Sequence, residues 1–237
     1  MNSHKSVKKK LFVLFLFTII SIKIFSQSQA QTQPDAGLWC TFTVEKEFTK
    51  KLTIGINEEI RLRENYSRLN LFYTNPYITY RLKKRLKLGL GYRFISKYMY
   101  KESGFSYKHR LMFDISYKYK FKKVVLSYRS RIQGEVRDYN SDPQGKQPEF
   151  YWRNKLDLGY EIGKFTPYIG TEVRYQIIDP RFPESNYGWH RARTYAGIDY
   201  EYNKKHSFGI MYLIQQEFDV DDPGTGYILG LEYTYKL

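Results

Sequence analysis

The amino-acid sequence predicts an all-β fold: a transmembrane antiparallel up-and-down β-barrel of ten to twelve strands, with short periplasmic turns and longer extracellular loops. From Leu38 onward, apolar and polar residues alternate at every second position, and no segment keeps helical spacing over three turns. The alternating segments are long enough to cross a bilayer, for which about 9 to 11 tilted residues suffice. Short and long connections also alternate along the chain, as they do in bacterial outer-membrane barrels.

The first thirty residues have the composition of a secretory signal peptide. A head with four lysines precedes a single apolar run, Leu11–Ile22, which is shorter than the roughly 20 residues that a membrane-spanning helix needs. We expect cleavage after Ser26 or Ala30, which leaves residues 31–237 as the barrel domain. Loss of the signal lowers the formal net charge from +15 to about +10.

Eleven segments carry the strand alternation. One face of each collects Leu, Ile, Phe and Tyr, and the opposite face collects mostly polar and charged residues. Single-chain bacterial barrels have even strand numbers, so either the first segment is not a full crossing, giving ten, or a further strand is hidden, giving twelve. The segments are 38–48, 52–64, 69–82, 86–98, 107–121, 124–137, 150–162, 166–178, 190–202, 206–218 and 226–237.

The connections between these segments differ in length in a regular way. The short ones are Thr49–Lys51, Lys83–Arg85, Lys122–Lys123, Gly163–Phe165 and Asn203–Lys205. The longer ones are "NYSR", "MYKESGFS", "DYNSDPQGKQPE", "DPRFPESNYGW" and "DVDDPGT". We expect the short turns in the periplasm and the long loops outside the cell.

The apolar face is expected to contact lipid, and the charged face to line the lumen. A soluble barrel with its apolar face inside would have to fill a wide interior, and it would leave bands of tyrosine on its outer surface. A barrel closed within a bilayer satisfies every backbone hydrogen bond. The predicted location is therefore the outer membrane of a Gram-negative bacterium.

Three phrases resemble a known family. They are "GLWCTFTVEKEFTKKLTI", "NPYITYRLKKRLKLGLGYRF" and the final "GLEYTYKL". Together they resemble the DUF2490 (domain of unknown function 2490) family of outer-membrane β-barrel proteins, and the resemblance covers essentially the mature chain. It implies a location and a fold rather than an activity. The alternating residues from Tyr227 to Leu237 also resemble the C-terminal signal that the barrel-assembly machinery reads, although such signals commonly end in Phe.

Thirteen basic residues have the inward parity and lie in the half of each strand next to the long loops. A positive outer mouth would concentrate anions, and guanidinium groups suit phosphate or carboxylate. Only Glu135 and Glu217 clearly oppose them there. These cations are Arg61, Arg63, Arg93, Lys97, Lys108, Arg110, Arg131, Arg137, Arg153, Lys155, Arg174, Arg191 and Arg193.

The lumen cluster allows two interpretations, a narrow anion-favouring channel or acidic-ligand site, and a static ion network that fills and closes the barrel. We favour the network, because side chains can fill a small barrel and buried charges demand partners. The expected role is therefore structural or transport-related.

A lipid-modifying enzyme is a further alternative. Ser96 and His109 have the outward parity on adjacent strands and could act as nucleophile and base, although no orienting acid is evident. An interfacial histidine among tyrosines is the preferred interpretation, so we expect no enzymatic activity.

We expect no metal and no cofactor. Asp219, Asp221 and Asp222 could hold calcium, but they lack the spacing of a dedicated calcium loop and suit a turn equally well. Cys40 is the only cysteine, which excludes an internal disulfide and any two-cysteine metal motif.

The expected partners follow from the charge and from export. An exported chain without a nucleic-acid-binding motif is not expected to meet nucleic acid. We expect outer-membrane lipid including lipopolysaccharide as a partner, and the barrel-assembly machinery during biogenesis.

Overall fold

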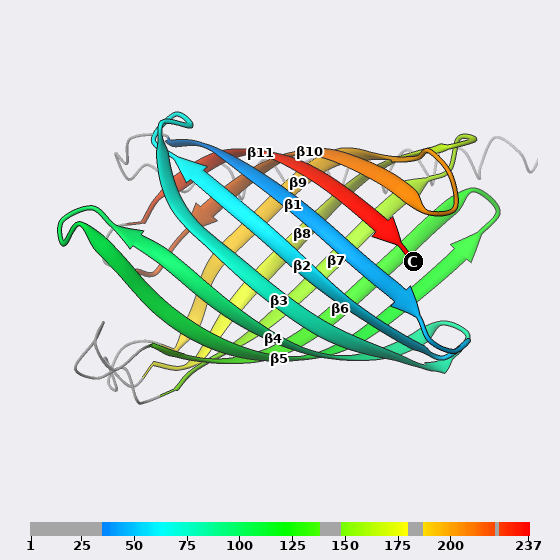
Figure 1. Ribbon diagram of the computed structural model, residues 1–237, viewed down its shortest axis with the longest axis horizontal. Helices are drawn as coiled ribbons and strands as arrows, with labels where there is room; N and C mark the ends of the chain where they lie inside the picture. Colours follow the sequence, from blue (N-terminus) through cyan, green and yellow to red (C-terminus); the bar gives the residue numbers. More distant parts are fainter. Residues whose placement is uncertain (1–34, 138–147, 180–186, 221–222) are drawn as a thin grey trace, which may run out of the picture. The chain divides into compact units, whose positions relative to one another are not determined.

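The computed structural model describes residues 35–137, 148–179, 187–220 and 223–237 as a β-barrel (Figure 1). The predicted signal peptide lies outside these residues. Every regular element in the described ranges is a strand, which confirms the predicted all-β barrel. The same ranges contain no helix that is long and apolar enough to cross a membrane. The strands are β1 (Asp35–Glu47), β2 (Leu52–Arg63), β3 (Arg68–Lys83), β4 (Leu86–Met99), β5 (Gly104–Phe121), β6 (Val124–Arg137), β7 (Glu149–Tyr160), β8 (Phe165–Ile178), β9 (Gly188–Glu201), β10 (His206–Glu217) and β11 (Thr225–Lys236).

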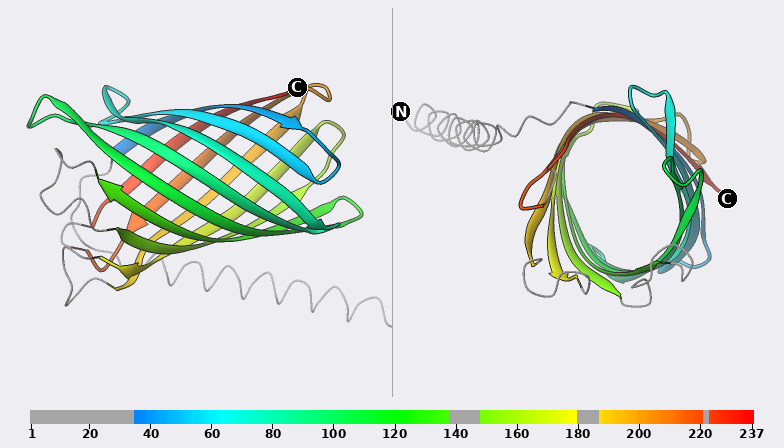
Figure 2. Two further views of the ribbon diagram at one scale, coloured as in Figure 1. Left: turned by 60° about the horizontal axis from the view of Figure 1, so that its bottom comes forward. Right: turned by 90° about the vertical axis from the view of Figure 1, so that its left-hand side faces the viewer.

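Consecutive strands pair antiparallel from β1 to β11, and the ring closes where β1 meets β11. Figure 2 shows this ring from one end. The closing pair is parallel and runs in register from Asp35 opposite Gly226 to Glu45 opposite Lys236. An odd number of alternating strands requires one parallel pair, because the first and last strands then run in the same direction.

The structure settles the strand count at eleven and corrects two expectations. β1 is a full strand with partners on both sides, so the interpretation that gave ten crossings is wrong, and the described residues hold no twelfth strand. The barrel is also not antiparallel throughout. Because β1 and β11 are parallel, the chain enters the barrel at the end that carries the longer loops and leaves it at the end with the short turns.

The connections lie alternately at the two ends of the barrel as predicted, but their lengths differ less than expected. Residues 64–67 join β2 to β3, and this predicted long loop has four residues, as many as three of the short turns. The connections after β6, β8 and β10 are longer. At the short-turn end, β5 and β6 are joined by Lys122 and Lys123 alone. At the opposite end, β4 and β5 extend further than expected, because Met99 pairs with Gly104. Only residues 100–103 of the predicted loop therefore lie outside the strands.

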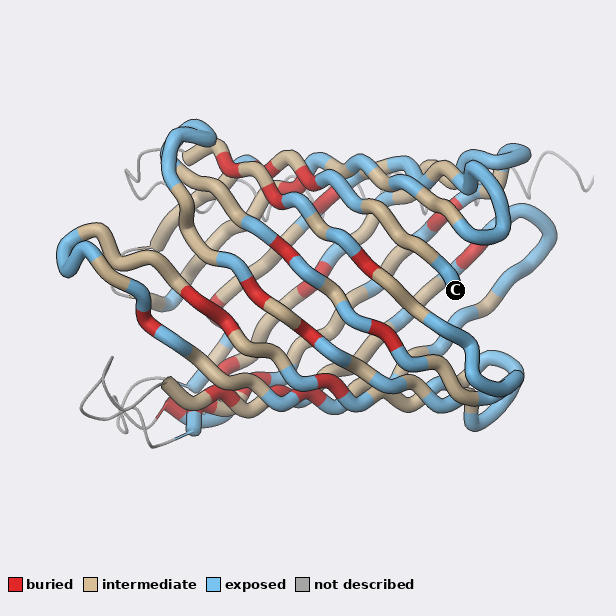
Figure 3. Tube along the Cα trace, in the orientation of Figure 1, coloured by how far each residue is buried: buried red, intermediate tan, exposed pale blue. Residues whose placement is uncertain are grey.

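The barrel wall has opposite polarity on its two faces, as Figure 3 shows from the alternation of buried and exposed residues along each strand. The outward face carries exposed aliphatic and aromatic side chains, among them Leu90, Leu111 and Ile169 at 56%, 61% and 60% exposure. The inward face buries polar groups such as Glu135 and Glu172. This polarity is the reverse of a soluble protein, where apolar residues are buried.

A small apolar cluster lies on the inward face beside the closing seam. It consists of Trp39, Tyr195, Leu213 and Ile228, with Tyr168 and Met211 packed against it. These residues come from β1 and from β8 to β11, whereas most inward arginines come from β6 to β9. The apolar cluster directly adjoins the basic residues of the lumen, because the guanidinium groups of Arg61 and Arg193 lie over the Trp39 ring.

Candidate functional site

Two cavities occupy the lumen. The larger, of about 430 Å³, is lined by eleven basic and five acidic side chains. The second, of about 340 Å³, lies nearer the longer loops and is lined by nine basic and three acidic side chains. Both cavities therefore carry an excess of positive charge.

Six residues line both cavities and mark their boundary. Five of them are arginines, contributed by β2, β5, β8 and β9. The guanidinium of Arg61 stacks on Trp39, with its central carbon 3.7 Å from the ring centre. A solute that passes from one cavity to the other must cross this arginine belt. The six residues are Trp39, Arg61, Arg110, Arg174, Arg191 and Arg193.

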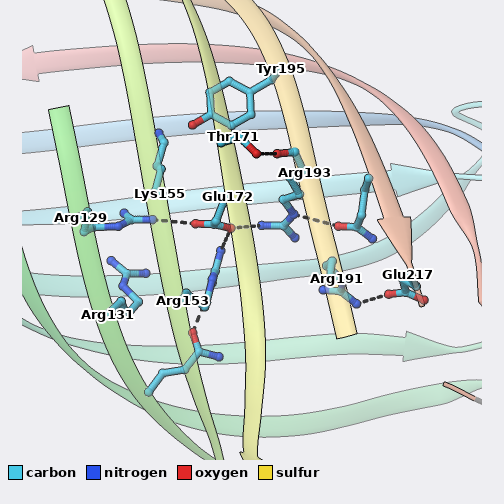
Figure 4. A network of polar contacts seen from close by, with 12 residues as sticks. Arg129, Arg131, Arg153, Lys155, Thr171, Glu172, Arg191, Arg193, Tyr195 and Glu217 are labelled. Carbon is cyan, nitrogen blue, oxygen red and sulfur yellow. Dashed lines mark hydrogen bonds and ion pairs between the residues drawn. The ribbon is translucent and has the colours of Figure 1, made fainter. Parts of the chain in front are cut away.

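Glu172 is the centre of the most extensive ion network in the described lumen (Figure 4). Its two carboxylate oxygens accept hydrogen bonds from three arginines. Arg129 Nη2 lies 2.9 Å from Oε2, and Arg193 Nη1 lies 3.0 Å from Oε1. Arg153 binds Oε1 as well. One buried carboxylate thus neutralises part of the charge on β6, β7 and β9.

Further carboxylates pair with lumen arginines on a neighbouring strand or on the same strand. Asp114 accepts two hydrogen bonds of 2.6 Å from Arg131. The expectation that only Glu135 and Glu217 oppose the basic cluster is therefore wrong. Asp114 lies directly opposite Arg131 and Glu172 directly opposite Arg193, whereas Glu59 lies two residues before Arg61 on the same strand. The additional partners are Glu59 for Arg61, Asp114 for Arg131, Glu149 for Arg137, and Glu172 for Arg153 and Arg193.

All thirteen cations predicted from parity line one or both cavities. Ten of them form an ion pair within the described part of the chain. Three do not: Arg93, Lys97 and Arg174. Arg93 donates instead to the amide oxygen of Asn75 at 3.1 Å and stacks on Tyr73 at 3.7 Å. The ten paired cations are Arg61, Arg63, Lys108, Arg110, Arg131, Arg137, Arg153, Lys155, Arg191 and Arg193.

The sequence reasoning missed several residues of this site. Arg129 has the same parity as Arg131 and binds Glu172, so the alternation alone could have identified it. Trp39 and Tyr73 also point inward and stack with arginines. The alternation also predicts that these two aromatic residues point inward. It does not predict which arginine stacks on each ring, because that depends on the register between strands.

Ser96 and His109 lie on adjacent strands, and no hydrogen bond joins their side chains in the described part of the chain. Ser96 is only 2% exposed, in register with Phe72 and Tyr107 on the outward face. His109 Nδ1 lies 2.6 Å from the hydroxyl oxygen of Tyr92. The arrangement supports the interpretation of His109 as a histidine within an aromatic surface.

The candidate calcium loop lies mostly outside the described residues. Asp221 and Asp222 are not described, and Asp219 has a positive φ of 52°, typical of a turn. No group of three or more His, Cys, Asp or Glu side chains suited to a metal ion occurs in the described ranges.

Comparison with known proteins places the chain in a family. Residues 36–224 match the family described as "Protein of unknown function (DUF2490)". The chain belongs to the DUF2490 family. The predicted family is thereby confirmed, and the first two of the three phrases lie within the matched residues. No curated protein matches this DUF2490 sequence.

Several solved structures match the chain. One of them is described as "Bacterial polysaccharide outer membrane secretin", with a TM-score of 0.50 and 11% sequence identity. The match covers 79% of the DUF2490 chain and 63% of that structure, so the chain spans less than two thirds of its length. At this identity the likeness concerns the fold alone.

Proposed function

We propose that this chain is an outer-membrane β-barrel protein of a Gram-negative bacterium, exported by its signal peptide. The outward face supports this, because its exposed aliphatic and aromatic residues continue around the strands. Soluble monomers rarely expose such extensive apolar surface, whereas hydrocarbon would cover it. The similarity to a solved outer-membrane structure agrees with the proposal at the level of fold.

Outward aromatic residues near both ends of the strands also support a membrane location. Near the short turns, Phe165 stacks on Tyr200 at 4.7 Å between ring centres. Near the opposite end, the rings of Trp152 and Trp189 lie 6.2 Å apart. Transmembrane barrels carry such aromatic girdles where the wall meets the lipid head groups.

The proposed orientation places the short turns in the periplasm. Leu237 then lies at the periplasmic end, and β1 begins at the outer end. We propose lipopolysaccharide as a neighbour of the outer half of the wall, and the barrel-assembly machinery as the partner that receives β11. Membrane fractionation tests the location, together with gel mobility before and after boiling in detergent. A closed barrel will migrate differently after boiling, whereas recovery in the soluble periplasm would overturn the proposal.

Within this barrel we propose an anion-favouring lumen. The observation that supports it most directly is the lining of the larger cavity, where eleven basic side chains face five acidic ones. An ion network of the kind favoured on sequence grounds surrounds Glu172. The excess of basic over acidic side chains in the larger cavity remains despite this network. A pore of one sign focuses counter-ions, and arginine forks bind oxyanions in two-point contacts.

Planar bilayer recording tests the lumen proposal. We expect small single-channel events whose reversal potential in a KCl gradient shows preference for chloride. Arg93→Gln removes a lumen charge that has no ion pair among the described residues, and it will weaken that preference, while Lys204→Gln on a short turn will leave it nearly unchanged. Cation preference, or no events in any salt, would contradict an anion-favouring lumen.

We also propose that the barrel has no enzymatic activity. The burial of Ser96 and the contact of His109 with Tyr92 support this. Phospholipid turnover by the wild type, lost in both Ser96→Ala and His109→Ala, would overturn it.

A further inference from the structure

Four arginines occupy one row of the lumen wall on four consecutive strands. Arg131 of β6 lies opposite Arg153 of β7, Arg153 lies opposite Arg174 of β8, and Arg174 lies opposite Arg191 of β9. We call these four residues the arginine row. All four line the larger cavity.

Carboxylates neutralise the positive charge at the two ends of the arginine row more fully than in its middle. At one end, Asp114 lies opposite Arg131 and pairs with it. At the other end, Glu217 lies opposite Arg191 and pairs with it. Glu172 serves Arg153 but is shared with two other arginines.

Arg174 has no carboxylate partner in the described part of the chain. Its guanidinium lies over the ring of Tyr151, 4.7 Å from the ring centre. Its Nε is shielded from solvent and has no hydrogen-bond partner. Like charges directly opposite each other on neighbouring strands are destabilising, and a buried donor without an acceptor adds a further cost.

The backbone is also irregular at this point. The pairing of β8 with β9 shifts between Arg174 and Tyr175, which marks a β-bulge. Bulges commonly redirect a side chain beside a functional site. An uncompensated arginine, an unsatisfied donor and a bulge therefore coincide at the edge of an open cavity.

We propose that the arginine row binds a linear, multivalent oxyanion, a ligand that carries two or more phosphate or carboxylate groups along its length. This proposal rests on the anion-favouring lumen and names its ligand class. An oxyanion between Arg153 and Arg174 accepts hydrogen bonds from both guanidinium groups and supplies the negative charge that the middle of the row lacks.

The geometry of the wall favours a ligand with several groups over a single ion. Neighbouring strands lie about 4.7–4.9 Å apart, so the four arginines present donors at regular steps. Barrel strands tilt by about 35–45°, so a row perpendicular to the strands climbs the wall obliquely. A linear ligand can thus contact successive arginines while it lies obliquely across the wall of the lumen.

Calorimetric titration of the refolded barrel in detergent micelles tests the proposal without requiring conductance. The probes are orthophosphate, pyrophosphate and tripolyphosphate, with citrate as the carboxylate arm. We expect affinity to rise by about ten-fold from orthophosphate to tripolyphosphate, since each added group engages another arginine. The strength of citrate binding relative to tripolyphosphate identifies whether the site prefers carboxylate or phosphate groups.

Variants separate the arginine row from the general field of the lumen. Arg174→Gln will weaken tripolyphosphate binding by about ten-fold through loss of charge-assisted hydrogen bonds. Arg174→Lys, which keeps the charge without the fork, will weaken it by about three-fold. Lys118→Gln removes the same charge from the same cavity but outside the row, and will change the affinity by less than about two-fold. Heat-modifiable gel mobility checks that each variant folds.

Equal affinity for the three phosphates, or equal losses in Arg174→Gln and Lys118→Gln, would overturn the arginine row as a site. If the barrel prefers chloride in bilayer recordings but does not bind tripolyphosphate in calorimetry, the arginine row is not a ligand site, and the anion-favouring lumen is still supported. Tripolyphosphate binding in a barrel that never conducts would support the row while refuting the channel.

Discussion

Glu172 shows how one residue stabilises the charged wall. It is 6% exposed and accepts hydrogen bonds from arginines on three strands. Its removal leaves three guanidinium groups close together without their shared counter-charge. Breaking a buried ion pair is costly, because the remaining charge keeps its desolvation penalty.

We therefore predict that Glu172→Gln lowers the free energy of unfolding by about 3 kcal/mol. Urea titration in detergent micelles, followed by tryptophan fluorescence, measures this change in the free energy of unfolding. Glu232→Gln is the matched control, because Glu232 lines the same cavity without an ion pair among the described residues. Equal stability of the two variants would show that the network contributes nothing.

Glu58 is an acidic residue on the mostly apolar outward face. It lies opposite Phe42 and Thr74, between Ile56 and Ile60 along β2, and it accepts a 2.7 Å hydrogen bond from the Thr74 hydroxyl. Hydrocarbon solvates a carboxylate poorly, so the proposed location makes this residue unfavourable.

We predict that Glu58→Gln raises the free energy of unfolding in phospholipid vesicles by about 1 kcal/mol, since it removes the charge and keeps an acceptor for Thr74. Glu102→Gln in an exposed loop will have no effect. A loss of stability in Glu58→Gln would mean that this face meets water or a cationic partner.

The sequence predicts which residues point inward, but not which of them meet. Alternation alone places Arg131 and Arg153 on the lumen wall, because parity is a local property of a strand. The link between Glu172 and Arg129 depends on the register of three strands, because Lys155 of β7 lies between them in the same row. Ser96 has the predicted outward parity, yet its burial depends on neighbouring aromatic side chains from other strands.

At the scale of the element, glycines on inward positions allow rings to lie flat across neighbouring strands. A Cβ on Gly197 would stand 2.6 Å from the Tyr168 ring and 2.7 Å from the carbonyl oxygen of Ile210. The ring could move, but the backbone of β10 is fixed by its own ladder. Gly197 is therefore required by close packing between β8, β9 and β10.

We predict that Gly197→Val costs about 2 kcal/mol of stability by overpacking. Ala196→Val, the adjacent residue on the outward face, is the control and will be nearly neutral. Thermal unfolding followed by circular dichroism compares the two. An unchanged midpoint for Gly197→Val would show that β9 and β10 separate more easily than their pairing indicates.

The closing seam could not be predicted from the sequence. Alternation and flanking turn residues mark each strand in the sequence. The predicted strand boundaries therefore lie close to the observed ones. Whether the first strand pairs with the last depends on the closure of the whole ring. The even-number rule favoured ten or twelve strands, whereas β1 closes the barrel in parallel with β11. Membrane barrels with odd strand numbers do exist.

At the scale of the whole molecule, a membrane barrel requires a different solvent at each face of its wall. The lumen proposals require water and ions inside, and the outward face then requires lipid. Cys40 offers a native probe of this point, because it is the only cysteine and is exposed on the outward face. It lies opposite Ile60 of β2 and Leu231 of β11, both of them exposed as well.

The most direct measurement attaches a bimane fluorophore to Cys40 of the barrel refolded in vesicles. We predict that brominated acyl chains quench its emission strongly, while aqueous iodide does not, because the fluorophore sits in hydrocarbon. Quenching by iodide with no effect of brominated lipid would place the outward face in water and contradict the membrane barrel.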